Sequence, residues 1–131
     1  MFIWTIFYLL CEISNTFSLG IIVTNTEVEK DTDGTLTCTV SGLTEQATIE
    51  WKSSPGGSAI ISDDTNYVIG GTGFDSLSNS QQSTLTVKAV STTADKTFYC
   101  AVTSTEWNLT DEETPVVLNV FGMFYYLTVL V

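Results

Sequence analysis

The chain has no histidine and no arginine, and its 131 residues include only four lysines and two prolines. Without histidine there is no Ser-His or Cys-His pair to activate a nucleophile, and without histidine or a cysteine cluster there is no zinc site of the usual kind. Nucleic acids and anionic membranes are poor partners, because neutralising phosphates takes clustered Lys or Arg. The sequence therefore argues against an enzyme, a zinc protein and a nucleic-acid-binding protein.

Acidic residues dominate the charge. Fifteen Asp and Glu give the chain a formal net charge of −11 at pH 7. Such a surface keeps a secreted protein soluble, but net charge says nothing about fold. The acidic runs at 63–64 and 111–113 fall in segments that we predict to be loops, where solvated carboxylates are the common case. We therefore predict no catalytic residue, no metal and no cofactor.

Cysteine is also scarce, and one of the three, Cys11, lies in an apolar run at residues 2–11. That run is too short to span a bilayer, which takes about 20 residues. It suits the core of a signal peptide, with Ser18 and Gly20 as the small residues before a cleavage site, although no basic residue precedes it. We predict a signal peptide over residues 1–20, with an apolar N-terminal strand as the alternative. Its removal leaves two cysteines, an even number suited to an oxidising compartment.

The remaining cysteines lie in short runs that alternate apolar and polar residues. Leu36 and Cys38 share one face of the first run, and Phe98 and Cys100 share one face of another. A period of two is typical of a half-buried strand. With room for one core, the chain is predicted to be a single all-β domain. The predicted strands cover residues 21–28 (split near 24–25), 34–40, 48–52, 83–90, 96–102 and 115–121.

The order Cys38, Trp51, Cys100 within residues 21–121 resembles that of immunoglobulin domains. The resemblance implies an antiparallel Greek-key sandwich of two sheets, closed by a disulfide between Cys38 and Cys100. The core residues that we expect beside this bridge are Trp51, Leu36, Leu85 and Phe98.

One feature departs from the family pattern, and a second leaves the type of immunoglobulin domain open. Phe98 and Ala94 stand where the family usually has the Tyr and Asp of its corner. Short strands at 58–62 and 67–69, before a flexible corner at 70–73, would supply the two extra strands of a variable-type domain. The segment is short for that type, so variable-like and intermediate sets both stay open.

Two surfaces are candidates for contact with a partner. The predicted loop at 104–114 carries Glu106 and Trp107. An aromatic residue on a loop often anchors a partner, although a Trp near a strand end also packs back over the sheet. The second candidate is the outward face of the central strands, with Glu50, Lys52 and Tyr99.

Two further segments bear on processing. Asn108 opens the only Asn-x-Ser/Thr sequon in the chain, in the predicted exposed loop, and we expect it to be glycosylated unless the loop or Trp107 blocks transfer. The tail at 122–131 is strongly apolar. It is interpreted as the first half of a membrane helix in a truncated chain, as a strand extension or as an interface segment.

We predict an extracellular immunoglobulin-like module, secreted or on the outer face of the plasma membrane, that binds a protein, a second copy of itself included. A membrane is a partner only if the tail is a truncated anchor. The alternative is an adhesion or spacer module of a larger ectodomain. A carbohydrate-binding sandwich would need exposed aromatic residues, for which Trp107, Tyr67 and Tyr99 are the candidates.

Overall fold

The computed structural model describes residues 18–90 and 95–122, which form eight strands. No helix able to cross a membrane occurs among these residues. The predicted signal peptide, except for residues 18–20, and the tail from residue 123 lie outside the described residues. The strands are β1 (Gly20–Thr24), β2 (Thr26–Glu29), β3 (Gly34–Ser41), β4 (Thr48–Lys52), β5 (Tyr67–Asp75), β6 (Ser80–Val87), β7 (Lys96–Ser104) and β8 (Leu109–Phe121).

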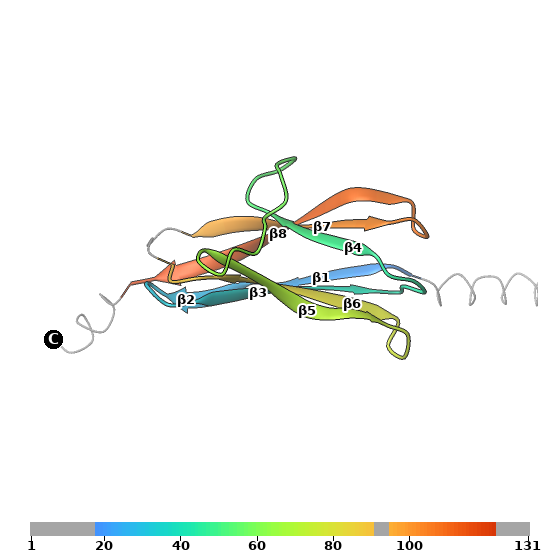
Figure 1. Ribbon diagram of the computed structural model, residues 1–131, viewed down its shortest axis with the longest axis horizontal. Coiled ribbons are helices and arrows are strands. Elements are labelled where there is room, and N and C mark those ends of the chain that lie inside the picture. The colour runs from blue at the N-terminus through green and yellow to red at the C-terminus, as the bar shows by residue number, and fades with distance from the viewer. Residues whose placement is uncertain (1–17, 91–94, 123–131) are drawn as a thin grey trace, which may run out of the picture.

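The strands form two four-stranded sheets that pack face to face (Figure 1). One sheet has the order β1-β3-β6-β5 and the other has the order β2-β8-β7-β4. All neighbours are antiparallel except β2 and β8, which run parallel. The predicted all-β sandwich of two sheets is confirmed.

The first strand is split, as the sequence predicted. β1 pairs with β3 in one sheet, and β2 pairs with β8 in the other. Asn25 lies between them, and its side-chain oxygen accepts a hydrogen bond from the backbone N–H of Val117, 2.8 Å away. This bond holds the crossing point against β8.

The core lies between the sheets, where the alternation predicted it. Leu36, Leu85 and Phe98 are buried, and Trp51 has no exposed surface. A disulfide joins Cys38 on β3 to Cys100 on β7, linking the two sheets beside Trp51. On the chain-entropy model, a cross-link enclosing a loop of this length stabilises the fold by about 4 kcal/mol.

The segment between β4 and β6 differs from the prediction. Residues 58–62 form no strand, only an isolated bridge between Ala59 and Lys52, so they do not supply an extra strand of the variable type. Residues 70–73 are not a corner but lie inside β5. Gly71 makes this possible with a φ of 120°, because a Cβ there would stand 2.3 Å from the carbonyl oxygen of Gln82.

The predicted loop at 104–114 is also shorter than expected. Only residues 105–108 turn, and β8 begins at Leu109, directly opposite Ser104. The acidic residues at 111–113 therefore lie on a strand. Their sequence shows no apolar alternation, but Glu112 and Glu113 pair with Val102 and Ala101 on β7. Asp111, with a φ of 47°, lies where the register shifts, and its N–H donates to the Thr103 hydroxyl at 3.1 Å.

Candidate functional site

The outer face of the β2-β8-β7-β4 sheet carries three of the predicted contact residues. Glu50 lies opposite Ala101, which in turn lies opposite Glu113 across β7 and β8. Two residues along β4, Lys52 lies opposite Tyr99. Because alternate residues of a strand point to the same side, the fold places Glu50, Lys52 and Tyr99 on one face.

That face is strongly acidic, and we call it the acidic face. Val28, Trp51, Val102 and Val116 point into the core, so the residues between them point outward. The outward ionisable residues of the four strands are Glu27, Glu29, Glu50, Asp111, Glu113 and Lys52. The face thus carries five carboxylates and one ammonium group.

Lys52 is buried rather than available on this face, which corrects the sequence-based expectation. Its side chain is 6% exposed, and its Nζ lies 3.4 Å from Oδ2 of Asp111. The chain after β4 folds back along the strand through the bridge to Ala59. The Lys52 ammonium is thus covered and paired, and it anchors Asp111 instead of offering a free contact.

The turn after β4 is fixed to β8 by a carboxylate. The backbone N–H of Gly56 donates to both side-chain oxygens of Glu113, at 2.9 and 3.0 Å. Further on, the N–H of Ile60 donates to the carbonyl of Trp51 at 2.7 Å. These bonds hold residues 53–60 at the rim of the acidic face.

Glu106 and Trp107, predicted as contact residues, use their polar groups within the chain. The Glu106 carboxylate accepts hydrogen bonds from the hydroxyl of Thr44 and from its N–H, the latter at 2.8 Å. These bonds, the hydroxyl first, lower the pKa of Glu106. Trp107 is half-buried against the core, and its Nε1 donates to the carbonyl of Gly42 at 3.0 Å. Both side chains tie the β7–β8 hairpin to the β3–β4 connection.

Asn108 is exposed at the tip of the same hairpin. It has a left-handed backbone with φ 54°, a conformation that Asn adopts more readily than most residues. Its N–H donates to the carbonyl of Thr105 at 3.2 Å, which closes the turn. The sequon therefore begins at a solvent-facing turn residue.

The aromatic residues of the carbohydrate hypothesis are not brought together. Tyr67 is half-buried and meets the ring of Phe98 edge-on, with centroids 6.2 Å apart. Tyr99 points outward from β7, and Trp107 packs at the hairpin. The three rings lie in separate places and form no shared platform.

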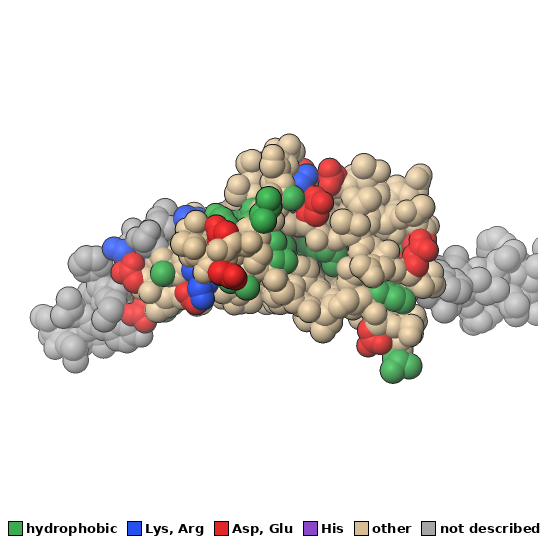
Figure 2. All heavy atoms as spheres, viewed as in Figure 1, with side chains coloured by type: hydrophobic (Ala, Val, Ile, Leu, Met, Phe, Trp, Pro, Cys, Tyr) green, Lys and Arg blue, Asp and Glu red, His purple; other side chains and the backbone are tan. Residues whose placement is uncertain are grey.

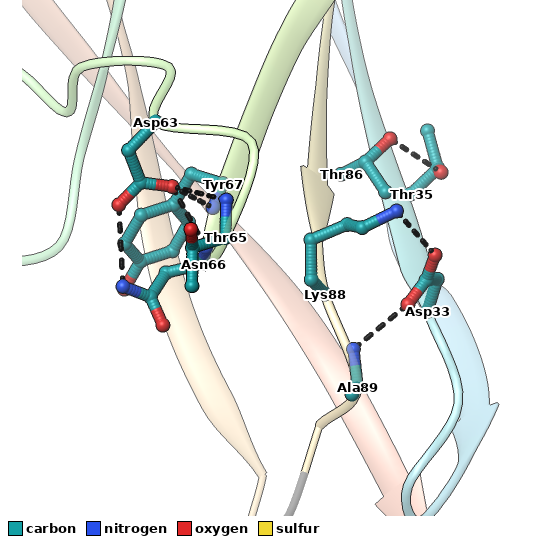
Figure 3. Close-up of polar contacts among 9 residues, drawn as sticks. All are labelled: Asp33, Thr35, Asp63, Thr65, Asn66, Tyr67, Thr86, Lys88 and Ala89. Atoms are coloured by element: carbon teal, nitrogen blue, oxygen red, sulfur yellow. Dashed lines mark hydrogen bonds and ion pairs between the residues drawn. The ribbon is translucent and has the colours of Figure 1, made fainter.

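Two aspartates with lowered pKa values form hydrogen bonds within the chain (Figure 3). Asp63 accepts hydrogen bonds from the backbone N–H groups of Tyr67, Asn66 and Thr65, which lowers its pKa to about 2. Asp33 accepts a bond from the N–H of Ala89 and pairs with Lys88 at 3.0 Å; both contacts lower its pKa. In the part of the chain that the structure describes, no three His, Cys, Asp or Glu side chains are grouped as metal ligands.

Sequence reasoning missed the polar residues that support the site from the core. Trp51 donates from Nε1 to the hydroxyl of Ser83 at 2.9 Å. The Gln81 amide pairs with both the N–H and the carbonyl of Ala47, at 2.9 and 2.8 Å. Extending the inward alternation backwards from Leu85 would have placed both side chains in the core.

Comparison with known proteins gives matches among solved structures. No family model matches the chain, and no curated protein matches it. The Ig1 domain of mouse SynCAM 2 is 18% identical, with a TM-score of 0.53, and the match covers 79% of this chain and 96% of that domain. The IG1 domain of Dpr1, solved bound to the IG1 domain of DIP-eta, is 13% identical, with a TM-score of 0.52 and coverage of 81% and 96%.

At sequence identities this low, the likeness shows the fold alone. Together with the two-sheet topology, the disulfide between Cys38 and Cys100 and the buried Trp51, it shows that the chain has an immunoglobulin-like fold. The resemblance drawn from the sequence is confirmed at the level of the fold.

Proposed function

We propose that the chain is an extracellular, non-catalytic recognition module that binds another protein through the acidic face. One observation carries this proposal: the face is ordered by contacts within the chain. The pair of Lys52 with Asp111 and the bonds from Gly56 to Glu113 fix two of its carboxylates. A surface that is ordered before binding loses less conformational entropy on association.

The charge of the face specifies the partner's chemistry. Its single ammonium group is already paired, so its remaining carboxylates favour a partner with a basic surface. Such charge complementarity raises the association rate, and this effect weakens as the ionic strength rises. Tyr99, half-buried on β7, gives the face an aromatic residue of the kind that is enriched in interfaces.

Two further findings support the proposal. The disulfide between Cys38 and Cys100 is suited to an oxidising compartment, as is the predicted signal peptide over residues 1–20. Among the structural neighbours, the IG1 domain of Dpr1 is bound to an IG1 domain of DIP-eta. A domain of this fold can therefore take another protein domain as its partner.

The test starts with expression of the full chain in secretory cells, followed by an intact mass without reductant. We expect a product in the medium that starts near Ile21 with both remaining cysteines oxidised. The product is then linked artificially into tetramers, and these are screened against an array of extracellular proteins that includes the chain itself. Binding is expected to weaken as salt rises from about 0.1 M to about 1 M.

Two variants with equal net charge test which surface binds the partner. Glu50→Lys reverses a charge within the acidic face, and Glu45→Lys makes the same change on the exposed β3–β4 connection. We expect Glu50→Lys to weaken binding by about tenfold or more and Glu45→Lys to leave it nearly unchanged. Equal effects of the two variants would overturn the assignment to the acidic face.

A spacer role is the second candidate, favoured by the path of the chain. Gly20 at the start of β1 pairs with Ser41, whereas Phe121 at the end of β8 pairs with Glu29 at the opposite end of the sandwich (Figure 1). The described chain thus enters at one end and leaves at the other. A folded product that binds nothing in the array would favour this role.

A further inference from the structure

The outer face of the β1-β3-β6-β5 sheet has a chemistry that the proposed function does not use. Along its two central strands, β3 and β6, every outward side chain from Thr35 to Ser41 and from Ser80 to Thr86 is Thr, Ser or Gln. The residues face each other in cross-strand pairs. Three of these pairs are Thr35 with Thr86, Thr37 with Thr84, and Ser41 with Ser80. The hydroxyls of the first pair lie 2.9 Å apart, as Figure 3 shows.

This face is free of charge between its two ends. Asp75 closes β5 at one end, and the pair of Lys88 with Asp33 lies at the other. Between them, no ionisable side chain points outward from the described strands of this sheet. Figure 2 agrees, because the visible part of this sheet is mostly tan along its length, with acidic and basic side chains gathered toward its ends. In a chain with a net charge of −11, such a face is unusual, and we call it the neutral face.

The neutral face also holds an exposed apolar group. Ile22 on β1 lies opposite Thr39 and is 62% exposed, while its neighbours Ile21 and Val23 pack against the core. At the other edge, Val68 on β5 lies opposite Thr86 and is half-buried. The threonine methyl groups add apolar surface between these two residues. The face can therefore exclude water on contact without leaving a charge unpaired.

Charge decides which partner fits. Two copies that approached through their acidic faces would bring carboxylates against carboxylates, which costs free energy. Through their neutral faces, the same two copies meet without opposing charges. We propose that a second copy of this chain docks on the neutral face, forming a two-fold symmetric dimer through the β1-β3-β6-β5 sheets.

The size of the face indicates a weak complex. The strands β1, β3, β6 and β5 have 5, 8, 8 and 9 residues. With a rise of about 3.4 Å per residue and a spacing of about 4.8 Å between strands, they cover roughly 500 Å² per copy. The total of roughly 1,000 Å² lies at the lower limit for a specific interface. We therefore expect a transient dimer, of the kind that is strengthened when several copies act together.

Sedimentation equilibrium of the full chain, purified from secretory expression, tests the proposal at protein concentrations up to about 1 mM. We expect a monomer–dimer equilibrium that strengthens when salt rises from about 0.1 M to about 1 M. Over this range the Debye length falls from about 10 Å to about 3 Å, which screens the net repulsion between the copies. The acidic-face partner is expected to respond to salt in the opposite direction, so the two proposals can fail separately.

Substitutions locate the interface. Thr37→Glu places a charge at the centre of the neutral face, and Thr97→Glu places the same charge outward on β7 of the other sheet. We expect the first to weaken the dimer by about tenfold or more and the second to leave it nearly unchanged. Ile22→Thr, which keeps a β-branched side chain, should weaken the dimer severalfold and serves if Thr37→Glu does not fold.

Three results would overturn the proposal. The first is a chain that stays monomeric throughout the concentration and salt range. The second is a dimer that weakens with salt. The third is a dimer that is lost in Thr97→Glu but kept in both Thr37→Glu and Ile22→Thr, because that would place the contact on the opposite sheet.

Discussion

Lys52 and Asp111 form an ion pair in which only one partner is buried. The Lys52 side chain is 6% exposed and that of Asp111 is 54% exposed, with 3.4 Å between Nζ and Oδ2. The lysine therefore depends on the pair more than the aspartate does. Removing Asp111 leaves a buried ammonium without its counter-charge, whereas removing the charge of Lys52 leaves a carboxylate that water can solvate.

This asymmetry predicts that substitutions of Asp111 and of Lys52 lower the free energy of unfolding by different amounts. We expect Asp111→Ala to lower the free energy of unfolding by about 1–2 kcal/mol, after allowance for the exposure of the carboxylate. Lys52→Met keeps the apolar stem and should cost less than Asp111→Ala. Urea unfolding of the two variants checks the order, and a larger loss for Lys52→Met would contradict it.

Gly71 should be intolerant of any side chain. Its φ of 120° is unfavourable for other residues, and a Cβ would stand 2.3 Å from the Gln82 carbonyl oxygen. We expect Gly71→Ala to destabilise the fold by about 1–3 kcal/mol. Gly73→Ala, two residues along β5, is the matched control, because nothing lies within 4 Å of a Cβ there. Thermal unfolding should place Gly73→Ala near the parent chain, and equal losses would contradict the prediction.

Asp63 should give the fold part of its acid sensitivity. Backbone hydrogen bonds hold its pKa at about 2 in the folded state, below the ordinary value of 3.8. A depressed folded pKa contributes stability that is complete above the ordinary value and is lost as pH falls from about 4 towards 2. Carbon NMR of the Asp63 carboxyl should show the low midpoint. Asp63→Asn should flatten the loss of stability over this window; an unchanged acid profile would argue against the prediction.

Trp107 is expected to act on stability and not on binding. Trp107→Phe keeps most of the apolar surface but removes the Nε1 hydrogen bond to Gly42. We expect a loss of about 1 kcal/mol in the free energy of unfolding. Affinity for the partner found in the tetramer screen should stay within about twofold. A large loss of affinity in a well-folded variant would return Trp107 to the set of contact residues.

Asn108 is expected to carry a glycan in the secreted chain. Enzymatic deglycosylation should lower the mass of the parent chain, and Thr110→Ala should abolish this shift. Thr110→Ala removes the sequon while keeping Asn108 in its left-handed turn position. A parent chain whose mass does not change on deglycosylation would refute the expectation.

Much of the fold could be predicted because its signals are local. Leu36, Cys38, Leu85 and Cys100 lie in runs whose period of two identifies both the strand and its buried face. The same runs, with Trp51 between them, were sufficient for the family resemblance. These features depend on neighbours within a few residues along the chain.

The features that sequence reasoning missed depend on pairing across the sheets. Residues 109–114 show no apolar alternation, and they are a strand because they pair with β7. The burial of Lys52 follows from the folded-back segment at 53–60 and from Asp111, neither of which the sequence places beside it. Glu106 likewise meets Thr44, a residue far away along the chain. The composition of the surface was therefore predictable, but its availability to a partner was not.

The crossing of the first strand between the sheets has a mechanical consequence. β2 and β8 run parallel over four residue pairs, from Thr26 with Leu118 to Glu29 with Phe121. A force that pulls the two ends of the domain apart slides these strands past each other along their length. Their hydrogen bonds then share the load at once instead of opening one by one. The domain should resist stretching along the line that joins the start of β1 to the end of β8 better than peeling from its side.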